Sequence, residues 1–370
     1  MPLAIPYTTA ASEFLYGHSA VYAALQAKRR KLYTLYLHRR AARLNSTPSL
    51  ETDIQNLANE AKINVRHVGD DWLPILDKMS GDRPHNGCVL EASALPRPPV
   101  IALGKVLYGS PLNPEKPRFT IEVAAQSQDD LNINGNPTEI LSKADHFRRP
   151  FVLLIDDVLD PGNLGAIIRS AYFLGVDAIA LSSRTCAPIT PVALKASAGA
   201  AEALPILSID DPAEFLRRSS AKGWKVYCGT APNYAATHGT PSSDSTPTKD
   251  TKSWAEPHTE YTLRRDGTLI DPDFSPIRFA PTILVVGGEG KGLRSNLTQS
   301  AYAFVEIRPQ INIGDFGVDS LNVSVATALL CADIIRPRPL TVKLPPKALR
   351  SKDSIETPPS GHFSPYAFED

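Results

Sequence analysis

The feature that most constrains the fold is a short apolar run that ends in a glycine-rich loop. Residues 283–286 are continuously apolar, and residues 287–292 follow as Gly-Gly-Glu-Gly-Lys-Gly. A strand that is apolar on both faces is typical of a parallel sheet covered by helices on each side. Glycines at its end let a ligand approach the backbone, because no Cβ stands in the way. We therefore expect a parallel α/β sheet with a ligand site at the carboxyl end of this strand.

The same pattern begins at Pro150. Residues 151–155 form another continuous apolar strand, and residues 166–174 a helix that ends at Gly175. Further strands are expected at 178–181 and 224–228, with helices between them. Alternating strands and helices predict a parallel α/β domain, which we place at residues 150–335.

The rest of the chain divides by composition. Residues 12–92 mix strand and helix patterns and predict a smaller α/β domain. Proline accounts for 33 of the 370 residues, above the usual level of about 5%. We expect a proline-rich linker at 93–149, in which the apolar residues around 100–106 and 119–123 could pair as one hairpin packed back onto a domain. We also expect a disordered insertion at about 231–280 and an unstructured basic tail at 336–370.

Composition also excludes several classes of protein. No apolar run approaches the roughly 20 residues of a membrane span. The four cysteines are scattered without a C-x-x-C pair, which disfavours a zinc site or a disulfide framework. We therefore expect no membrane segment and no metal. The formal net charge is zero, so nucleic acid could be bound only by a local patch.

One such patch is visible near the N-terminus. The stretch from Phe14 to Leu50 holds no acidic residue, and Tyr33 and Tyr36 lie among its cations. Basic and aromatic side chains together suit phosphates and exposed bases. A solvated helix end beside an ordinary strand is the alternative. The residues proposed to bind RNA are Lys28, Arg29, Arg30, Arg39 and Arg40.

The glycine loop invites two nucleotide-binding interpretations, and neither fits. A dinucleotide fingerprint opens a helix in the first strand–helix unit, whereas these glycines come late and at other offsets. A phosphate-binding loop needs Ser or Thr after its lysine, but Gly292 follows Lys291. An NAD- or nucleotide-binding enzyme is thereby disfavoured. Glu289 places a charged side chain in the loop at the carboxyl end of a buried strand, where α/β folds bind their ligands.

Polar residues mark two further helix starts. Asn163 can cap the helix that follows it, and Arg169 interrupts an otherwise apolar helix, where a charge needs a partner or a function. A last helix is expected to open at Ser320, with Asn322 close behind. Free N–H groups and short polar side chains at such a start suit a small polar ligand.

Together, residues 163–169, 287–292 and 320–326 resemble the ordered motifs of the SpoU (TrmH-type) RNA ribose 2′-O-methyltransferases of the SPOUT class. Residues 195–199 resemble a continuation of the first motif. Residues 14–17 and 85–87 look like the two ends of the family's N-terminal substrate-binding domain, which resembles a ribosomal RNA-binding protein. One departure is the segment 307–320, which is longer than is usual in the family.

The resemblance implies a sheet tied into a trefoil knot, an exception to the usual absence of knots. It also implies S-adenosylmethionine as cofactor, no metal, and a homodimer. Arg169 would assist deprotonation of the ribose hydroxyl, oriented by its neighbours. The implied catalytic residues are Asn163, Arg169, Glu289, Ser320 and Asn322, and the implied cofactor-binding residues are Val286, Gly287, Gly288, Ile307, Pro309 and Leu321.

The linker, insertion and basic tail look most like those of fungal mitochondrial members that modify a guanosine in large-subunit rRNA. We therefore expect a mitochondrial matrix enzyme, although no presequence is apparent. Two alternatives stay open: a tRNA 2′-O-methyltransferase, and a ribosome-assembly factor that binds rRNA without catalysis.

Overall fold

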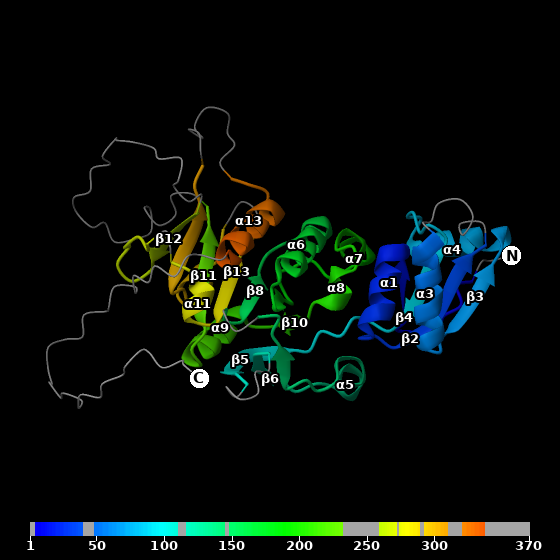
Figure 1. Ribbon diagram of the computed structural model, residues 1–370, viewed down its shortest axis with the longest axis horizontal. Coiled ribbons are helices and arrows are strands. Elements are labelled where there is room, and N and C mark those ends of the chain that lie inside the picture. Colours follow the sequence, from blue (N-terminus) through cyan, green and yellow to red (C-terminus); the bar gives the residue numbers. More distant parts are fainter. Residues whose placement is uncertain are drawn as a thin grey trace, which may run out of the picture.

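The computed structural model describes residues 4–39, 48–109, 116–144, 148–231, 259–271, 274–288, 292–309 and 320–336. Within these residues the chain forms a four-stranded, a three-stranded and a seven-stranded sheet. Figure 1 shows the four-stranded sheet at one end of the molecule, with the seven-stranded sheet toward the other. The expected α/β class is confirmed for both domains.

The N-terminal domain has the strand order β1-β4-β2-β3. Its strands are β1 (Glu13–Tyr16), β2 (Leu32–His38), β3 (Asn64–Val68) and β4 (Cys88–Ala92), and its helices are α1 (His18–Ala27), α3 (Pro48–Glu60), η1 (Asp70–Trp72) and α4 (Leu73–Ser80). Successive residues alternate between two cores, as the pleat of a strand requires. Leu35 and Leu37 pack with residues of α1 and α3, whereas Tyr36 packs with residues of α4.

The seven-stranded sheet has the order β10-β9-β8-β13-β11-β14-β12. Its strands are β8 (Phe151–Ile155), β9 (Ala178–Ser182), β10 (Ile206–Ile209), β11 (Lys225–Thr230), β12 (Thr259–Leu263), β13 (Thr282–Val286) and β14 (Ala303–Ile307). Every neighbouring pair is parallel except β12 and β14. The glycine-terminated strand β13 therefore occupies the centre, between β8 and β11.

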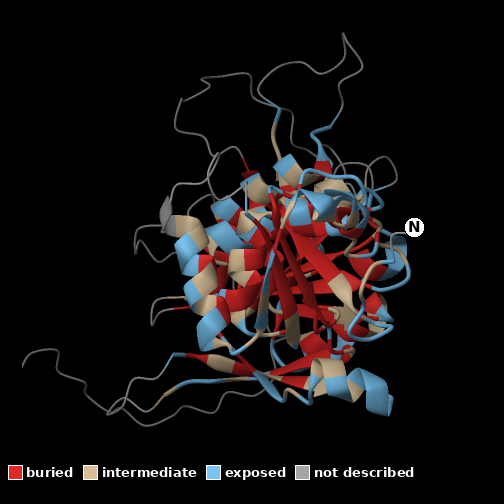
Figure 2. Ribbon diagram, turned by 90° about the vertical axis from the view of Figure 1, so that its right-hand side faces the viewer, coloured by how far each residue is buried: buried red, intermediate tan, exposed pale blue. Residues whose placement is uncertain are grey.

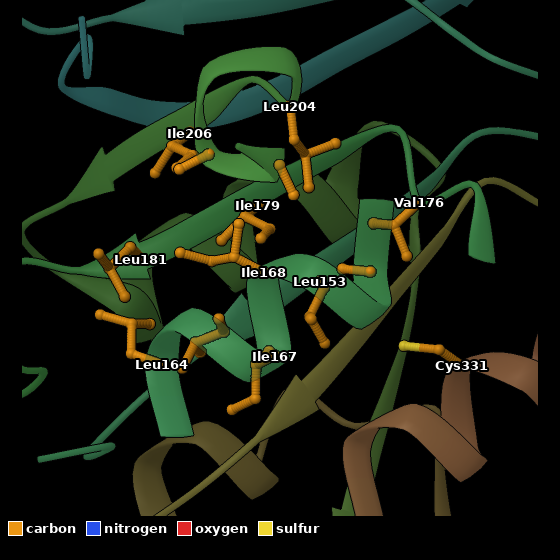
Figure 3. Packing of buried hydrophobic residues seen from close by; sticks show 14 of the residues in the cluster. Leu153, Leu164, Ile167, Ile168, Val176, Ile179, Leu181, Leu204, Ile206 and Cys331 are labelled. Atoms are coloured by element: carbon orange, nitrogen blue, oxygen red, sulfur yellow. The ribbon is translucent and has the colours of Figure 1, made fainter. Parts of the chain in front are cut away.

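Helices cover both faces of this sheet, and the burial colours of Figure 2 show its strands enclosed between them. One face carries α6 (Pro161–Leu174), α7 (Pro191–Ala196), α8 (Ala200–Ala203), α11 (Pro276–Phe279) and α13 (Val323–Ile335). The other carries α9 (Pro212–Ala221) and α12 (Ser295–Thr298). In Figure 3, Ile168 of α6 lies next to Ile179 of β9, and Cys331 of α13 belongs to the same apolar cluster.

Residues 93–149 correct an expectation, because they contain a folded unit. An antiparallel sheet of β5 (Val100–Leu107), β6 (Arg118–Val123) and β7 (Glu139–Leu141) is accompanied by α5 (Gln128–Asn134). We call residues 99–141 the inserted module; its residues 110–115 lie outside the described part. Phe119 is fully buried and meets Trp224 edge to face at 5.2 Å. The Trp224 indole N–H also donates to the carbonyl of Gly104 at 2.8 Å.

The insertion at 231–280 is likewise only partly as expected. Residues 259–271 and 274–280 are ordered, and β12 closes the sheet by pairing with β14. Tyr261 is buried and donates to Asp333 of α13 at 2.8 Å, which explains why this segment is held. The serine- and threonine-rich part, 232–258, and the basic tail from 337 onward lie outside the described residues.

The described residues contain neither a membrane-spanning helix nor a cluster of metal ligands. None of the helices there is long and apolar enough to cross a membrane. Likewise, no three of the described His, Cys, Asp and Glu side chains gather as a metal site would require.

Candidate active site and RNA-facing surface

The candidate site lies at the carboxyl edge of the seven-stranded sheet. Because β8, β13 and β14 belong to one parallel set, the segments that follow them emerge at the same edge. Asp156 follows β8, Gly287 follows β13 and Arg308 follows β14. The segments near residues 163, 287 and 307 therefore emerge at the same edge of the sheet.

Two predicted residues meet here directly. The side-chain amide of Asn322 donates to the Asn163 carbonyl oxygen at 3.1 Å, across 159 positions of sequence. Asn322 is also the N-cap of α13, because its side-chain oxygen, Oδ1, accepts from the Ser324 backbone N–H at 2.9 Å. The positive N-terminal ends of α6 and α13 therefore face one place, which favours an anion or a developing negative charge.

Two details of these helix starts differ from expectation. The last helix begins at Val323, and Ser320 precedes it. The cap of α6 is Asp160, whose carboxylate accepts from the backbone N–H of Asn163 at 2.6 Å, with Pro161 opening the helix. Asp followed by Pro is a strong helix start. Asn163 therefore lies in the first turn, where its side chain contacts Asn322 instead of capping α6.

Arg169 lies farther along α6 and is exposed. Within the described part of the chain, its guanidinium makes no hydrogen bond or ion pair. A cation on this helix is tolerated because it faces solvent, so burial does not demand a partner for it. It stands beside exposed apolar residues, since Phe173, one turn away, has 87% of its surface accessible. Arg169 is thus available to a phosphate or an oxyanion.

The glycines after β13 are required by a close contact between loops. A Cβ added at Gly288 would lie 2.0 Å from the backbone oxygen of Asp157, in the loop after β8. A Cβ at Gly287 would lie 3.0 Å from the Leu293 side chain. The backbone of Asp156 also donates to Val286 at 3.0 Å. Packing between these loops therefore explains the glycines, and cofactor binding by Val286, Gly287 and Gly288 stays a prediction.

Sequence reasoning missed an ion pair at the same edge, between the buried Asp156 and the partly exposed Arg294. Asp156 is 1% exposed, and its carboxylate accepts from Arg294 at 2.7 and 2.9 Å and from the Thr185 hydroxyl at 2.6 Å. The pair ties the loop after β8 to the segment that follows the glycine loop. A carboxylate directly after a buried strand was the available signal, but its partner is 138 positions away.

The other site predictions fall at the edge or outside the described residues. Ile307 ends β14, Pro309 follows it, and Leu321 is half exposed in front of α13. Glu289 and Arg40 lie outside the described residues. Burial raises the pKa of the nearby Cys186 thiol to about 11, so this cysteine is not a nucleophile at neutral pH.

The predicted RNA-binding patch divides into two groups. Lys28 and Arg39 are exposed, consistent with contact to RNA. The Arg30 side chain is fully buried and binds Glu202 of α8 at 2.7–3.0 Å, Glu13 at 2.6 Å and the Ser93 carbonyl at 2.8 Å. For Arg30, the RNA-binding prediction is therefore wrong.

Arg29 has a similar structural role. Its guanidinium donates to the backbone carbonyls of Leu204 at 2.7 Å and Glu202 at 3.3 Å, at the end of α8. Orphan carbonyls at a helix end need such donors. Arg29 and Arg30 thus join the N-terminal domain to the larger domain. We call Arg29, Arg30, Glu13 and Glu202 the domain joint. The run of basic residues in the sequence does not reveal what Arg29 and Arg30 contact, because Glu202 is 172 positions from Arg30.

Comparisons with known proteins agree with these features. Residues 150–332 match the SpoU rRNA Methylase family, and residues 14–98 match the RNA 2′-O ribose methyltransferase substrate binding family. The chain is 33% identical over 333 residues to rRNA methyltransferase 1, mitochondrial, of Saccharomyces cerevisiae, covering 87% of this chain and 69% of that protein. It is 32% identical over 327 residues to the Schizosaccharomyces pombe protein of the same name, covering 88% and 90%.

Solved structures share the fold. The crystal structure of AdoMet bound rRNA methyltransferase from Sinorhizobium meliloti aligns with a TM-score of 0.50 and 20% identity, covering 88% of this chain and 87% of that one. The SpoU methyltransferase AviRb from Streptomyces viridochromogenes aligns with a TM-score of 0.51 and 16% identity, covering 88% and 90%.

Proposed function

Because the chain belongs to the SpoU rRNA methylase family, we propose that it methylates a ribose 2′-hydroxyl of rRNA with S-adenosylmethionine. The observation that carries the proposal is the meeting of Asn163 and Asn322 at the carboxyl edge, beside the bare glycine backbone of the loop after β13. The relatives are named rRNA methyltransferases, and the S. meliloti structure is titled as AdoMet bound.

The reaction needs little from the protein beyond alignment. When bound, the cofactor supplies a methyl group on a sulfonium, already attached to a good leaving group. The ribose oxygen would form the new bond to the methyl carbon as the bond from that carbon to sulfur breaks, and the hydroxyl proton would pass to solvent. Positioning the hydroxyl in line with the methyl is the main task. Asn163, Asn322, Ser320 and Glu289 are proposed to orient the ribose and the adjoining loops.

Arg169 is proposed as the group that stabilises negative charge on the ribose oxygen as its proton leaves. Its guanidinium is exposed and unpaired within the described residues, so it can bind the oxygen or an adjacent phosphate. The high pKa of any arginine makes it a poor base. Its contribution is therefore electrostatic, and a lysine should replace it only in part, because lysine lacks the planar fork.

The cofactor is proposed to lie along the ends of β13 and β14, against Val286, Gly287, Gly288, Ile307, Pro309 and Leu321. Gly287 and Gly288 are half-buried at this edge, and as glycines they have no side chain to cover their main-chain groups. A trefoil knot is also proposed for this region. The central position of β13 between two strands that precede it supports a threaded chain end.

A homodimer is proposed from the exposed apolar surface of α6 and α13, which pack together. Val325 and Leu329, one turn apart on α13, are 49% and 46% exposed, and Phe173 of α6 is 87% exposed. Contiguous apolar side chains on a folded surface indicate a protein interface. A second copy is the proposed occupant, because Phe173 lies one turn from the exposed Arg169 on α6, so a partner docked there would add its residues around Arg169. Leu329→Glu should give monomers by light scattering.

The proposed location is the mitochondrion, and the proposed target is a guanosine of large-subunit rRNA. Both rest on the relatives, which are named mitochondrial rRNA methyltransferase 1 and, in Pseudomonas aeruginosa, 23S rRNA (guanosine-2′-O-)-methyltransferase. A tRNA target remains the alternative that the experiment compares directly.

The test combines purified protein, radiolabelled S-adenosylmethionine and transcripts of either mitochondrial large-subunit rRNA or tRNA. Methylated riboses are mapped by their resistance to alkaline cleavage. We expect one labelled ribose in the rRNA, loss of labelling with Arg169→Ala, and normal labelling with Arg265→Ala, an exposed arginine in the turn after β12. Cofactor and RNA binding without transfer would instead indicate a non-catalytic assembly factor.

A further inference from the structure

A groove of about 690 Å³ lies where the N-terminal domain, the inserted module and the start of β10 meet. Lys28 and Lys31 line one side, and Asn132, Gly135 and Leu141 line the other. Figure 1 shows α5 of the inserted module below the stretch that joins β4 to β5. The groove belongs to neither matched family segment alone, because residues 99–149 lie between them.

The charge of the groove is positive. Lys28 and Lys31 are both exposed, and within the described residues neither ammonium group makes an ion pair or hydrogen bond. The acid that lines the groove, Glu139, is paired with Arg118 at 3.2 Å. Two cations therefore face the groove without a countercharge, and such a surface attracts polyanions.

The domain joint holds these lysines in place. They flank Arg29 and Arg30 in the chain, and both arginines are anchored to α8 or to its Glu202. The backbone N–H of Lys31 also donates to the Ser93 hydroxyl at 3.1 Å. The two ammonium groups therefore project from a fixed turn, so binding an anion there costs less ordering than on a free loop.

The facing wall offers amides and apolar surface. Asn132 is exposed, and Leu141 has 59% of its surface accessible. Asn134 accepts from the Arg97 backbone N–H at 2.7 Å and donates to Gln126 at 2.8 Å, which fixes the end of α5. A nucleic-acid strand requires cations that bind its phosphates, and amides and apolar side chains that contact its sugars and bases. The groove offers these two sets on opposite walls.

We propose that this groove binds a second, single-stranded segment of the RNA substrate, distant from the methylated ribose. The inference rests on the proposed function. Pro205 and Ile206, at the amino end of β10, line the groove, whereas the candidate active site lies at the carboxyl ends of the parallel strands. The groove therefore contributes to substrate affinity and leaves the chemical step unchanged.

The test uses the full chain with Lys28→Glu/Lys31→Glu. The control is Lys62→Glu/Lys105→Glu, which makes the same charge change at exposed lysines that do not line the groove. We expect the groove variant to bind a long rRNA transcript at least ten-fold more weakly, with raised KM, unchanged kcat and unchanged cofactor affinity. The slope of log K against log salt should fall by about 1.4, or about 0.7 for each lost phosphate contact to a single strand.

Further arms separate the possible failures. A short stem-loop that contains only the methylated site should bind both variants equally. Lys28→Gln/Lys31→Gln repeats the measurement if circular dichroism shows that the charge reversal unfolds the protein. Equal RNA affinity of the groove and control variants overturns the proposal while native methylation stands. If the groove variant binds RNA more weakly but the native protein shows no transferase activity, only the proposed function is overturned. Polyglutamate that competes as well as RNA of equal charge would overturn RNA specificity.

Discussion

Replacing Arg30 by methionine tests whether the two domains form one cooperative unit. The Arg30 side chain is fully buried and the Glu202 carboxylate is 3% exposed, so the substitution leaves a buried carboxylate without its cation. Removal of one partner from a buried ion pair typically costs about 3–5 kcal/mol. Glu13→Gln should cost only about 0–1 kcal/mol, because the Glu13 side chain is 43% exposed and water replaces its partner.

The double variant Arg30→Met/Glu202→Met provides the matched control. It removes both charges together, and apolar replacement of a buried pair is often close to neutral. We therefore expect its stability to lie within about 1 kcal/mol of the native protein. The coupling energy between the two positions then equals most of the loss seen in the single variant.

The assay is urea denaturation followed by circular dichroism and by hydrogen exchange of peptides from β2 and β8. In the native protein both peptides should lose protection at the same urea concentration. In Arg30→Met the β2 peptide should lose it first, because the joint no longer couples the domains. A loss below about 1 kcal/mol with coincident transitions would refute the role given to this pair.

Two other predictions concern the candidate site and the buried thiols. Gly288→Ala should lower the cofactor affinity measured by calorimetry at least ten-fold and destabilise the fold by about 1–3 kcal/mol. The reason is that its Cβ would lie 2.0 Å from the Asp157 backbone oxygen. Unchanged affinity would contradict the role given to this contact between loops. The unfolding free energy should fall as pH rises above 9, as measured by urea titration between pH 7 and 11. The reason is that burial raises the pKa of Cys186 from 9.0 to about 11, and the pKa of Cys228 and Cys331 from 9.0 to about 12. The unfolded thiols ionise first, so this stability is present below pH 9 and lost above it; a flat profile would show that these thiols are hydrated.

The sequence predicted the parts of the fold whose signals are local. The apolar run at 151–155 and the glycines after residue 286 each carry their burial and loop chemistry within a few residues. Only the family resemblance implied that Asn163 and Asn322 belong to one site, and the structure shows that their side chains are hydrogen-bonded. The signal for the cap of α6 was also local, because Asp160 followed by Pro161 indicates a helix start more strongly than Asn163 does.

Other features could not be found this way, because their physical cause lies elsewhere in the chain. Phe119 has few apolar neighbours in sequence and is buried by Trp224, which belongs to another domain. The cations at 29 and 30 look like a solvent-facing patch until Glu202 is brought beside them. Strand β7 and helix α5 of the inserted module, together with the edge strand β12, therefore looked like linker and insertion.

The central position of β13 has a consequence for folding. Both of its neighbours, β8 and β11, are synthesised before it, and more than fifty residues separate the end of β11 from its start. Until β13 arrives, the apolar edges of those two strands have no partner, and they are open to mispairing or aggregation. Pairings of such long sequence separation form slowly. We therefore expect refolding of the larger domain to be slow and dependent on concentration, and chains that end before residue 282 to be insoluble.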